Sequence, residues 1–131
     1  MLFTTSSVMQ AALLFTATML PVVNGIIAVG NQIRDDGRHY NVAWQEGISP
    51  CMVGVPIAPE GETLCNQNFF INGVEYYLVD CKDTSTGEAQ KPARLRRAKD
   101  NSLYGYCTAV QKKNIDCTGN THNVIKRYLC E

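Results

Sequence analysis

The chain has 131 residues, and its twelve basic side chains are balanced by twelve acidic ones, so the formal net charge is zero. This balance excludes the general attraction to nucleic acid or to anionic membranes that a strongly basic protein shows. The length is enough for one domain, and too short for two once an apolar leader is set aside.

Residues 1–25 contain no charged side chain, and residues 11–20 form an apolar run of the length found in secretory signal peptides. This run is too short to span a membrane. We expect cleavage after Gly25, with Ala28 as a second option and a buried N-terminal helix as the alternative interpretation. No later segment reaches the roughly 18 apolar residues that a spanning helix needs, so we expect a mature chain of about 106 residues without a membrane anchor.

Residues 30–37 are polar and rich in turn formers, which predicts a flexible N-terminal arm at 26–37 ahead of a single disulfide-rich domain at 38–131. Residues 38–44 alternate in hydropathy and predict a strand whose Trp44 anchors the core. Residues 52–57 are apolar but contain glycine and proline, which suits an edge strand or a bulged loop. A short helix is compatible with residues 58–66.

Asn72-Gly73, within residues 67–81, is the strongest local signal in the chain. Aromatic and β-branched runs flank this dipeptide, which supplies the two positive-φ residues of a type I′ turn, so we expect a β-hairpin. One face of the second strand would carry Glu75, Tyr77 and Val79, and the other Val74, Tyr76 and Leu78. Both faces carry apolar bulk, and we expect one tyrosine face to meet the core.

The rest of the chain also predicts strands. Residues 82–90 are polar and indicate an exposed loop. Strands at 93–98 and 103–110, joined by a turn at 99–101, would form a second hairpin, and residues 123–130 would form the last strand. With about six or seven short strands, we expect a mainly β fold, a small disulfide-stapled antiparallel sheet or sandwich.

Six cysteines lie beyond the leader, and an even number behind a secretory leader predicts a disulfide framework. Spacing does not choose among the fifteen pairings that six cysteines allow. The two nearest cysteines are ten positions apart, unlike the close pairs of a metal site, so we expect neither a metal nor another cofactor. The expected disulfide residues are Cys51, Cys65, Cys81, Cys107, Cys117 and Cys130.

The segment 91–99 carries five positive charges in nine residues and is the main basic cluster. Three interpretations remain open: a contact surface for phosphate or an acidic partner, a nuclear-import signal that would act inside a host cell, or a solvated edge strand that basic residues protect from pairing.

Catalytic motifs are sparse. The two histidines, His39 and His122, lie in polar stretches where we expect them to be exposed. Glu75 with either histidine would make an acid–base pair, but the sequence does not show that they meet. We therefore expect no catalytic residues and a protein that is not an enzyme.

The leader, the small mature size and the even cysteine set, without an enzyme motif, resemble small secreted cysteine-rich effectors of plant-colonising fungi. The resemblance covers the whole chain and is compositional. It implies a protein that acts in the host apoplast or inside host cells, commonly by binding a host protein to dampen immunity.

Residues 94–108 resemble the strand–turn–strand of guanyl-specific fungal ribonucleases, with an arginine strand followed by Asn101, Leu103, Gly105 and Thr108. Glu75 stands where that family has its catalytic glutamate. Ala109 stands where the family has its catalytic histidine, and the upstream Tyr-Pro-His element is missing. The resemblance implies an α+β ribonuclease-like scaffold without catalysis, as an alternative to the mainly β fold.

Three functions follow from these observations. The first is a monomeric effector that binds a host protein. The second is a ribonuclease-like module that binds RNA and cuts it weakly or not at all, and the third is a secreted antimicrobial toxin. The candidate binding residues are Arg94, Arg96, Arg97, Lys99, Tyr104 and Tyr106.

Overall fold

The computed structural model describes residues 25–82, 91–119 and 121–131. The described chain is mainly β, and its α-helix has only four residues. The elements are β1 Ile27–Ile33, β2 His39–Gln45, α1 Pro50–Val53, β3 Val55–Pro59, β4 Phe69–Ile71, β5 Val74–Val79, β6 Arg94–Arg97, β7 Leu103–Ile115 and β8 Val124–Cys130. The expected leader and most of the expected loop at 82–90 lie outside the described residues.

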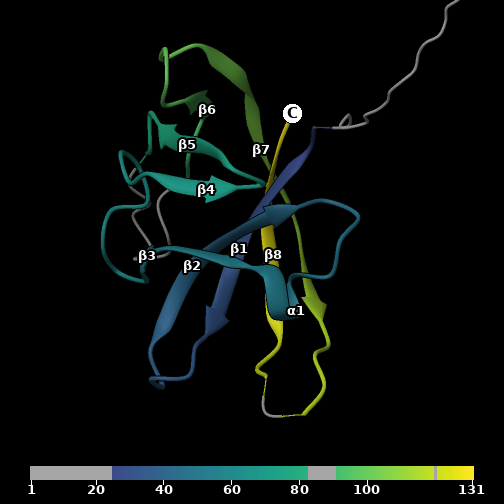
Figure 1. Ribbon diagram of the computed structural model, residues 1–131. Helices are drawn as coiled ribbons and strands as arrows, with labels where there is room; N and C mark the ends of the chain where they lie inside the picture. The colour runs from purple at the N-terminus through teal and green to yellow at the C-terminus, as the bar shows by residue number, and fades with distance from the viewer. Residues whose placement is uncertain (1–24, 83–90, 120) are drawn as a thin grey trace, which may run out of the picture.

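The strands form one antiparallel sheet in the order β3-β2-β1-β8-β7-β6-β5-β4 (Figure 1). The sheet curls until its two edge strands, β3 and β4, contact each other, so it is nearly closed. The 13-residue β7 belongs to both halves of the sheet, since residues 103–106 pair with β6 and residues 107–115 run along β8. The mainly β prediction is confirmed.

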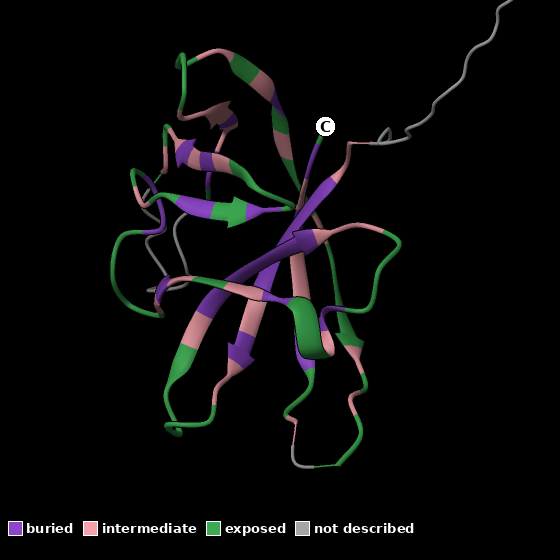
Figure 2. Ribbon diagram, viewed as in Figure 1, coloured by how far each residue is buried: buried purple, intermediate pink, exposed green. Residues whose placement is uncertain are grey.

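Two apolar clusters fill the two faces of the sheet. The larger cluster lies inside the curl and includes Leu64, Leu78 and Leu95, which are at most 1% exposed. The smaller cluster, around Trp44, lies on the other face of β1, β2 and β8. As a result, β1 and β2 are buried along most of their length (Figure 2).

Gly30 allows the smaller cluster to pack closely. A Cβ atom at this position would lie 2.1 Å from the carbonyl oxygen of Ile125 and 3.1 Å from the Trp44 ring. The register of β1 against β8 also shifts between Val29 and Gly30. Glycine therefore lets the neighbouring backbone approach β1. The 1% exposure of Trp44 confirms its predicted role as a core anchor.

The Asn72-Gly73 hairpin is confirmed. Both turn residues have positive φ, 53° for Asn72 and 80° for Gly73, as a type I′ turn requires. The turn joins β4 to β5 with Ile71 opposite Val74. Tyr76 and Leu78 are buried, so the face that contains Tyr76 is the one that meets the core.

The prediction of a flexible arm at residues 26–37 is wrong. Residues 27–33 form β1, which pairs with β2 on one side and β8 on the other. Ile27, Ala28 and Val29 are all buried because both faces of this strand are covered, so its apolar residues run consecutively and do not alternate. The turn formers Asp35, Asp36 and Gly37 occupy the short connection to β2.

The remaining elements largely follow the sequence. The strand at 38–44 is confirmed as β2, and the edge strand proposed for 52–57 is confirmed as β3, although α1 takes its first residues. Ser49 caps α1, and Pro50 occupies its first turn. No helix occurs at 58–66, which the structure describes throughout. The second hairpin is confirmed as β6 and β7, and the last strand as β8.

Three disulfides staple this sheet, and they use all six cysteines as expected. Cys107–Cys130 joins residues that are paired across β7 and β8. Cys65–Cys81 ties the segment before β4 to the end of β5, and Cys51–Cys117 ties α1 to the segment after β7. Among the described residues, no helix is long and apolar enough to cross a membrane.

Candidate functional site

The basic cluster lies mainly on β6, which the sheet places between β5 and β7, so the edge-strand interpretation is wrong. Leu95 is fully buried in the curl. Because side chains alternate along a strand, Arg94 and Arg96 point to the opposite, outer face. The extended backbone thus presents two of the predicted arginines to solvent.

Two tyrosines lie next to these arginines on the outer face. Tyr106 is paired with Arg94, and Tyr77 is paired with Arg96. We call these four residues the arginine–tyrosine face. Tyr106 is 61% exposed, and two further exposed apolar side chains on the same surface are Phe70 and Leu103.

Neighbouring groups hold both arginines in place. Arg94 makes an ion pair with Asp80, which leaves little net charge at that position. The Nη1 of Arg96 donates to the backbone oxygen of Asn101 at 2.8 Å, and the Tyr77 hydroxyl donates to the Asn101 side chain at 2.7 Å. These contacts reduce the side-chain entropy that binding a partner would cost.

Arg97 and Tyr104 do not belong to this face. The Tyr104 ring packs edge-on against Tyr76 with 5.2 Å between centroids, and the Arg97 guanidinium lies 5.0 Å from the Tyr104 centroid. Burial raises the pKa of both tyrosines. Arg97 and Tyr104 therefore support the core, whereas Lys99 lies exposed in the turn after β6.

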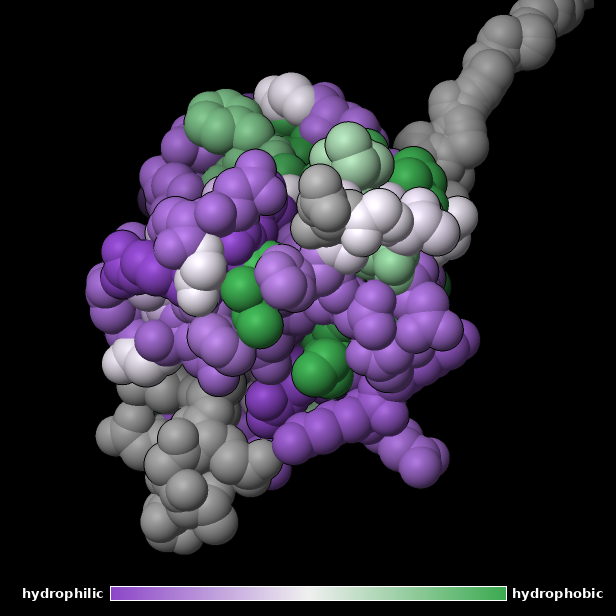
Figure 3. Space-filling model, turned by 90° about the horizontal axis from the view of Figure 1, so that it is seen from below, coloured by the Kyte–Doolittle hydropathy of each residue, from purple (hydrophilic) through white to green (hydrophobic). Residues whose placement is uncertain are grey.

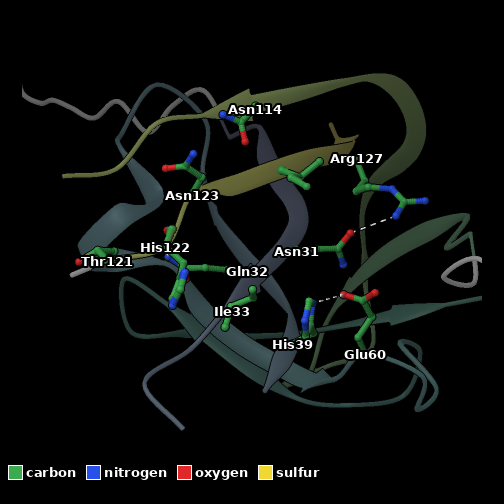
Figure 4. Close-up of a pocket in the computed structure, with 11 residues that line it drawn as sticks. Asn31, Gln32, Ile33, His39, Glu60, Asn114, Thr121, His122, Asn123 and Arg127 are labelled. Carbon is green, nitrogen blue, oxygen red and sulfur yellow. Dashed lines mark hydrogen bonds and ion pairs between the residues drawn. The ribbon is translucent and has the colours of Figure 1, made fainter. Parts of the chain in front are cut away.

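A polar pocket of about 520 Å³ lies at one end of the nearly closed sheet, the end that carries the β1–β2 turn and the β7–β8 connection (Figure 4). Figure 3 shows this end as a hydrophilic surface with small hydrophobic areas. No local sequence pattern predicts this pocket. Its lining consists of Asn31, Gln32, Ile33, His39, Glu60, Asn114, Thr121, His122, Asn123, Ile125 and Arg127.

Asn31, Asn41 and Arg127 form a hydrogen-bonded chain beside the pocket. The Asn31 amide donates to the side-chain oxygen of Asn41 at 2.8 Å, and the Arg127 Nη1 donates to the side-chain oxygen of Asn31 at 3.0 Å. The three side chains come from three different strands, so the order β2-β1-β8 brings them together.

Gln32 links the floor of the same pocket to its rim. Its side-chain nitrogen donates to the backbone oxygen of His122 at 2.9 Å, and its side-chain oxygen accepts from Arg34 at 3.0 Å. Arg34 also donates to the backbone oxygen of Gly54. The connection before β8 is thereby tied to β1.

Both histidines line this pocket and are exposed, as expected. The Nδ1 of His39 lies 4.0 Å from a carboxylate oxygen of Glu60. The acid–base pairing with Glu75 does not form, since Glu75 lies outside the pocket and accepts a hydrogen bond from Asn68 at 3.1 Å. No pattern in the sequence joins His39 to His122, because only the sheet order brings them into one pocket.

A search of family models, of curated proteins and of solved structures found no match to this chain. Within the described ranges, no group of three or more histidine, cysteine, aspartate or glutamate side chains is placed to hold a metal ion.

Proposed function

We propose that this protein is a secreted binding protein without catalytic activity, and that it acts as an effector by engaging a host protein through the arginine–tyrosine face. One observation carries the proposal: Tyr77, Arg94, Arg96 and Tyr106 lie together on the outer face of a rigid, disulfide-stapled sheet. Tyrosine and arginine are the residue types that most often dominate binding energy at protein interfaces.

The charges on this face favour a protein partner over a nucleic acid. Asp80 pairs with Arg94, and Glu75 lies on the same outer surface. A phosphate backbone is attracted by an excess of cations, whereas a protein partner is recognised through aromatic area and a few oriented polar groups. The exposed Phe70 and Leu103 add apolar area at the margin of the face.

Secretion is the other part of the proposal. The apolar leader at 1–25 would direct export, and three disulfides suit an oxidising compartment. The compositional resemblance to fungal effectors supplies the proposed role, suppression of host immunity in the apoplast or inside host cells. We propose a monomer as the acting form.

Charge reversal on the face tests the proposal. Residues 26–131 would be expressed in an oxidising system, with Arg94→Glu/Arg96→Glu as the test variant and Lys113→Glu as a control on exposed β7. We expect a plant protein to bind wild type and the control with the same affinity, and to bind the double variant at least about tenfold more weakly.

Two results would contradict the binding of a host protein through this face. The first is equal binding of that plant protein to wild type and the double variant. The second is RNA as the ligand of the face, which would show a steep loss of affinity with salt because each neutralised phosphate releases counterions. Cleavage of total RNA that disappears in Glu75→Gln would contradict the absence of catalysis.

A further inference from the structure

The buried polar residues of the described chain lie in the lining of the polar pocket or directly beside it. Gln32 is 4% exposed and Asn41 is 2% exposed, and no other polar or charged residue in the described ranges is buried to this extent. Both belong to the hydrogen-bond network of the pocket. Apolar residues of similar shape would pack there at little or no cost in stability, so the fold alone does not account for this polar end.

The lining has little net charge at neutral pH. It contains one guanidinium, from Arg127, and one carboxylate, from Glu60. A strong anion site needs an excess of cationic groups, and a cation site needs an excess of carboxylates. An apolar ligand would need mainly apolar walls, but only Ile33 and Ile125 are apolar in this lining.

The remaining lining groups both donate and accept hydrogen bonds. Four amide side chains, two imidazoles and one hydroxyl are present, and amides and hydroxyls serve both roles. A neutral polyhydroxylated ligand has the matching chemistry, because each of its hydroxyls also donates and accepts. The two isoleucines provide small apolar areas for the C–H groups of such a ligand.

We propose that this pocket binds a neutral carbohydrate, as a short segment of an oligosaccharide. The volume of about 520 Å³ is in the range of small-molecule sites, about 300–1,000 Å³. Gln32 and Asn31 are already fixed by their neighbours, so the floor is pre-organised. His39 and Glu60 stand on one side of the pocket, with Thr121 and His122 on the other (Figure 4). This site is separate from the arginine–tyrosine face and does not depend on it.

Backbone amide NMR of isotope-labelled, disulfide-bonded protein tests this site. The probes are cellotetraose, the tetramer of N-acetylglucosamine and, as an acidic comparison, tetragalacturonate. We expect a neutral tetramer to give saturable shifts at Asn31, Thr121 and His122, with a dissociation constant in the millimolar range or tighter. Thr121→Ala/His122→Ala should weaken this binding at least about tenfold, since both residues lie on the rim and not in the core.

Two more variants separate binding from folding. Gln32→Met keeps the volume of the buried side chain and should weaken binding while the protein stays folded. Val74→Ala, in the β4–β5 hairpin outside the pocket, should leave binding unchanged. Any of three results would overturn the proposal: no saturable shifts with either neutral tetramer, shifts that map outside the pocket, or binding of tetragalacturonate alone.

Discussion

The two halves of the sheet differ in how they are buried. In β1 and β2 the central residues are buried on both faces, for example Ala28 and Val29 in β1. In β5 and β6 only one face is buried, and the other carries the arginine–tyrosine face. The comparison indicates that the first half mainly provides stability, whereas the second half can carry a binding surface because its outer side chains are not needed for packing.

Trp44 lies in the half of the sheet that is buried on both faces, and its truncation should have the largest effect on stability. Trp44→Ala should lower the free energy of unfolding by about 3–5 kcal/mol, because it removes a large ring that is 1% exposed. Ile48→Ala is the control, since this side chain is 48% exposed and should cost well under about 1 kcal/mol. Urea unfolding followed by circular dichroism measures both, and equal costs would contradict the comparison.

Removal of two different disulfides gives a second test of how the two halves of the sheet are stabilised. By the chain-entropy account, Cys51→Ala/Cys117→Ala should cost about 4 kcal/mol, because the bond closes a loop with a sequence separation of 66. Cys65→Ala/Cys81→Ala should cost about 3 kcal/mol, because its separation is 16. Differential scanning calorimetry of the two double variants gives the order, and a larger loss from the shorter loop would show that local packing dominates.

Substitutions on the arginine–tyrosine face should have small effects on stability. Arg96→Ala removes a half-exposed side chain and its bond to the Asn101 backbone oxygen, so the free energy of unfolding should fall by no more than about 1 kcal/mol. Leu95→Ala is the neighbouring buried control and should cost about 2–5 kcal/mol. Urea midpoints that fall equally for both would mean that β6 is not divided into a buried face and a free face.

The smallest expected effect is a pH dependence in the β1–β2 turn. A hydrogen bond from the Arg38 backbone lowers the pKa of Asp36 below its ordinary value of 3.8, and a bond from the Tyr40 hydroxyl adds to this. The pKa of Asp36 is lower in the folded state than in the unfolded state. Its contribution to the free energy of unfolding is therefore present above pH 3.8 and is lost as the pH falls through the folded pKa. Thermal melts at several acidic pH values should show this loss in wild type and not in Asp36→Asn.

Local sequence predicted the hairpins because their geometry depends on neighbouring residues. Asn72-Gly73 is sufficient to set a type I′ turn, whatever the rest of the chain does. The strand β1 was not predictable in the same way. Its polar Asn31 and Gln32 are accommodated by partners on β2 and in the β7–β8 connection, which only the sheet order provides.

The candidate sites show the same limit. Alternation around Leu95 places Arg94 and Arg96 outside, and it would also have placed Arg97 on the inner side. Tyr104 was not separable from Tyr106, because the register of β6 against β7 shifts between Leu95 and Arg96, and this bulge turns Tyr104 inward. The residues that line the polar pocket come from distant parts of the chain, so no local sequence pattern predicts it.

Site-specific photo-crosslinking at Tyr106 tests the proposed function most directly. Tyr106 would be replaced by p-benzoylphenylalanine and the purified protein irradiated in plant extract or apoplastic fluid, with the same photoreactive residue at Val74 as control. We expect one discrete protein adduct from position 106 that is absent from position 74 and is lost with Arg94→Glu/Arg96→Glu. The same adduct from both positions, its persistence in the double variant, or an adduct removed by ribonuclease would contradict the proposed function.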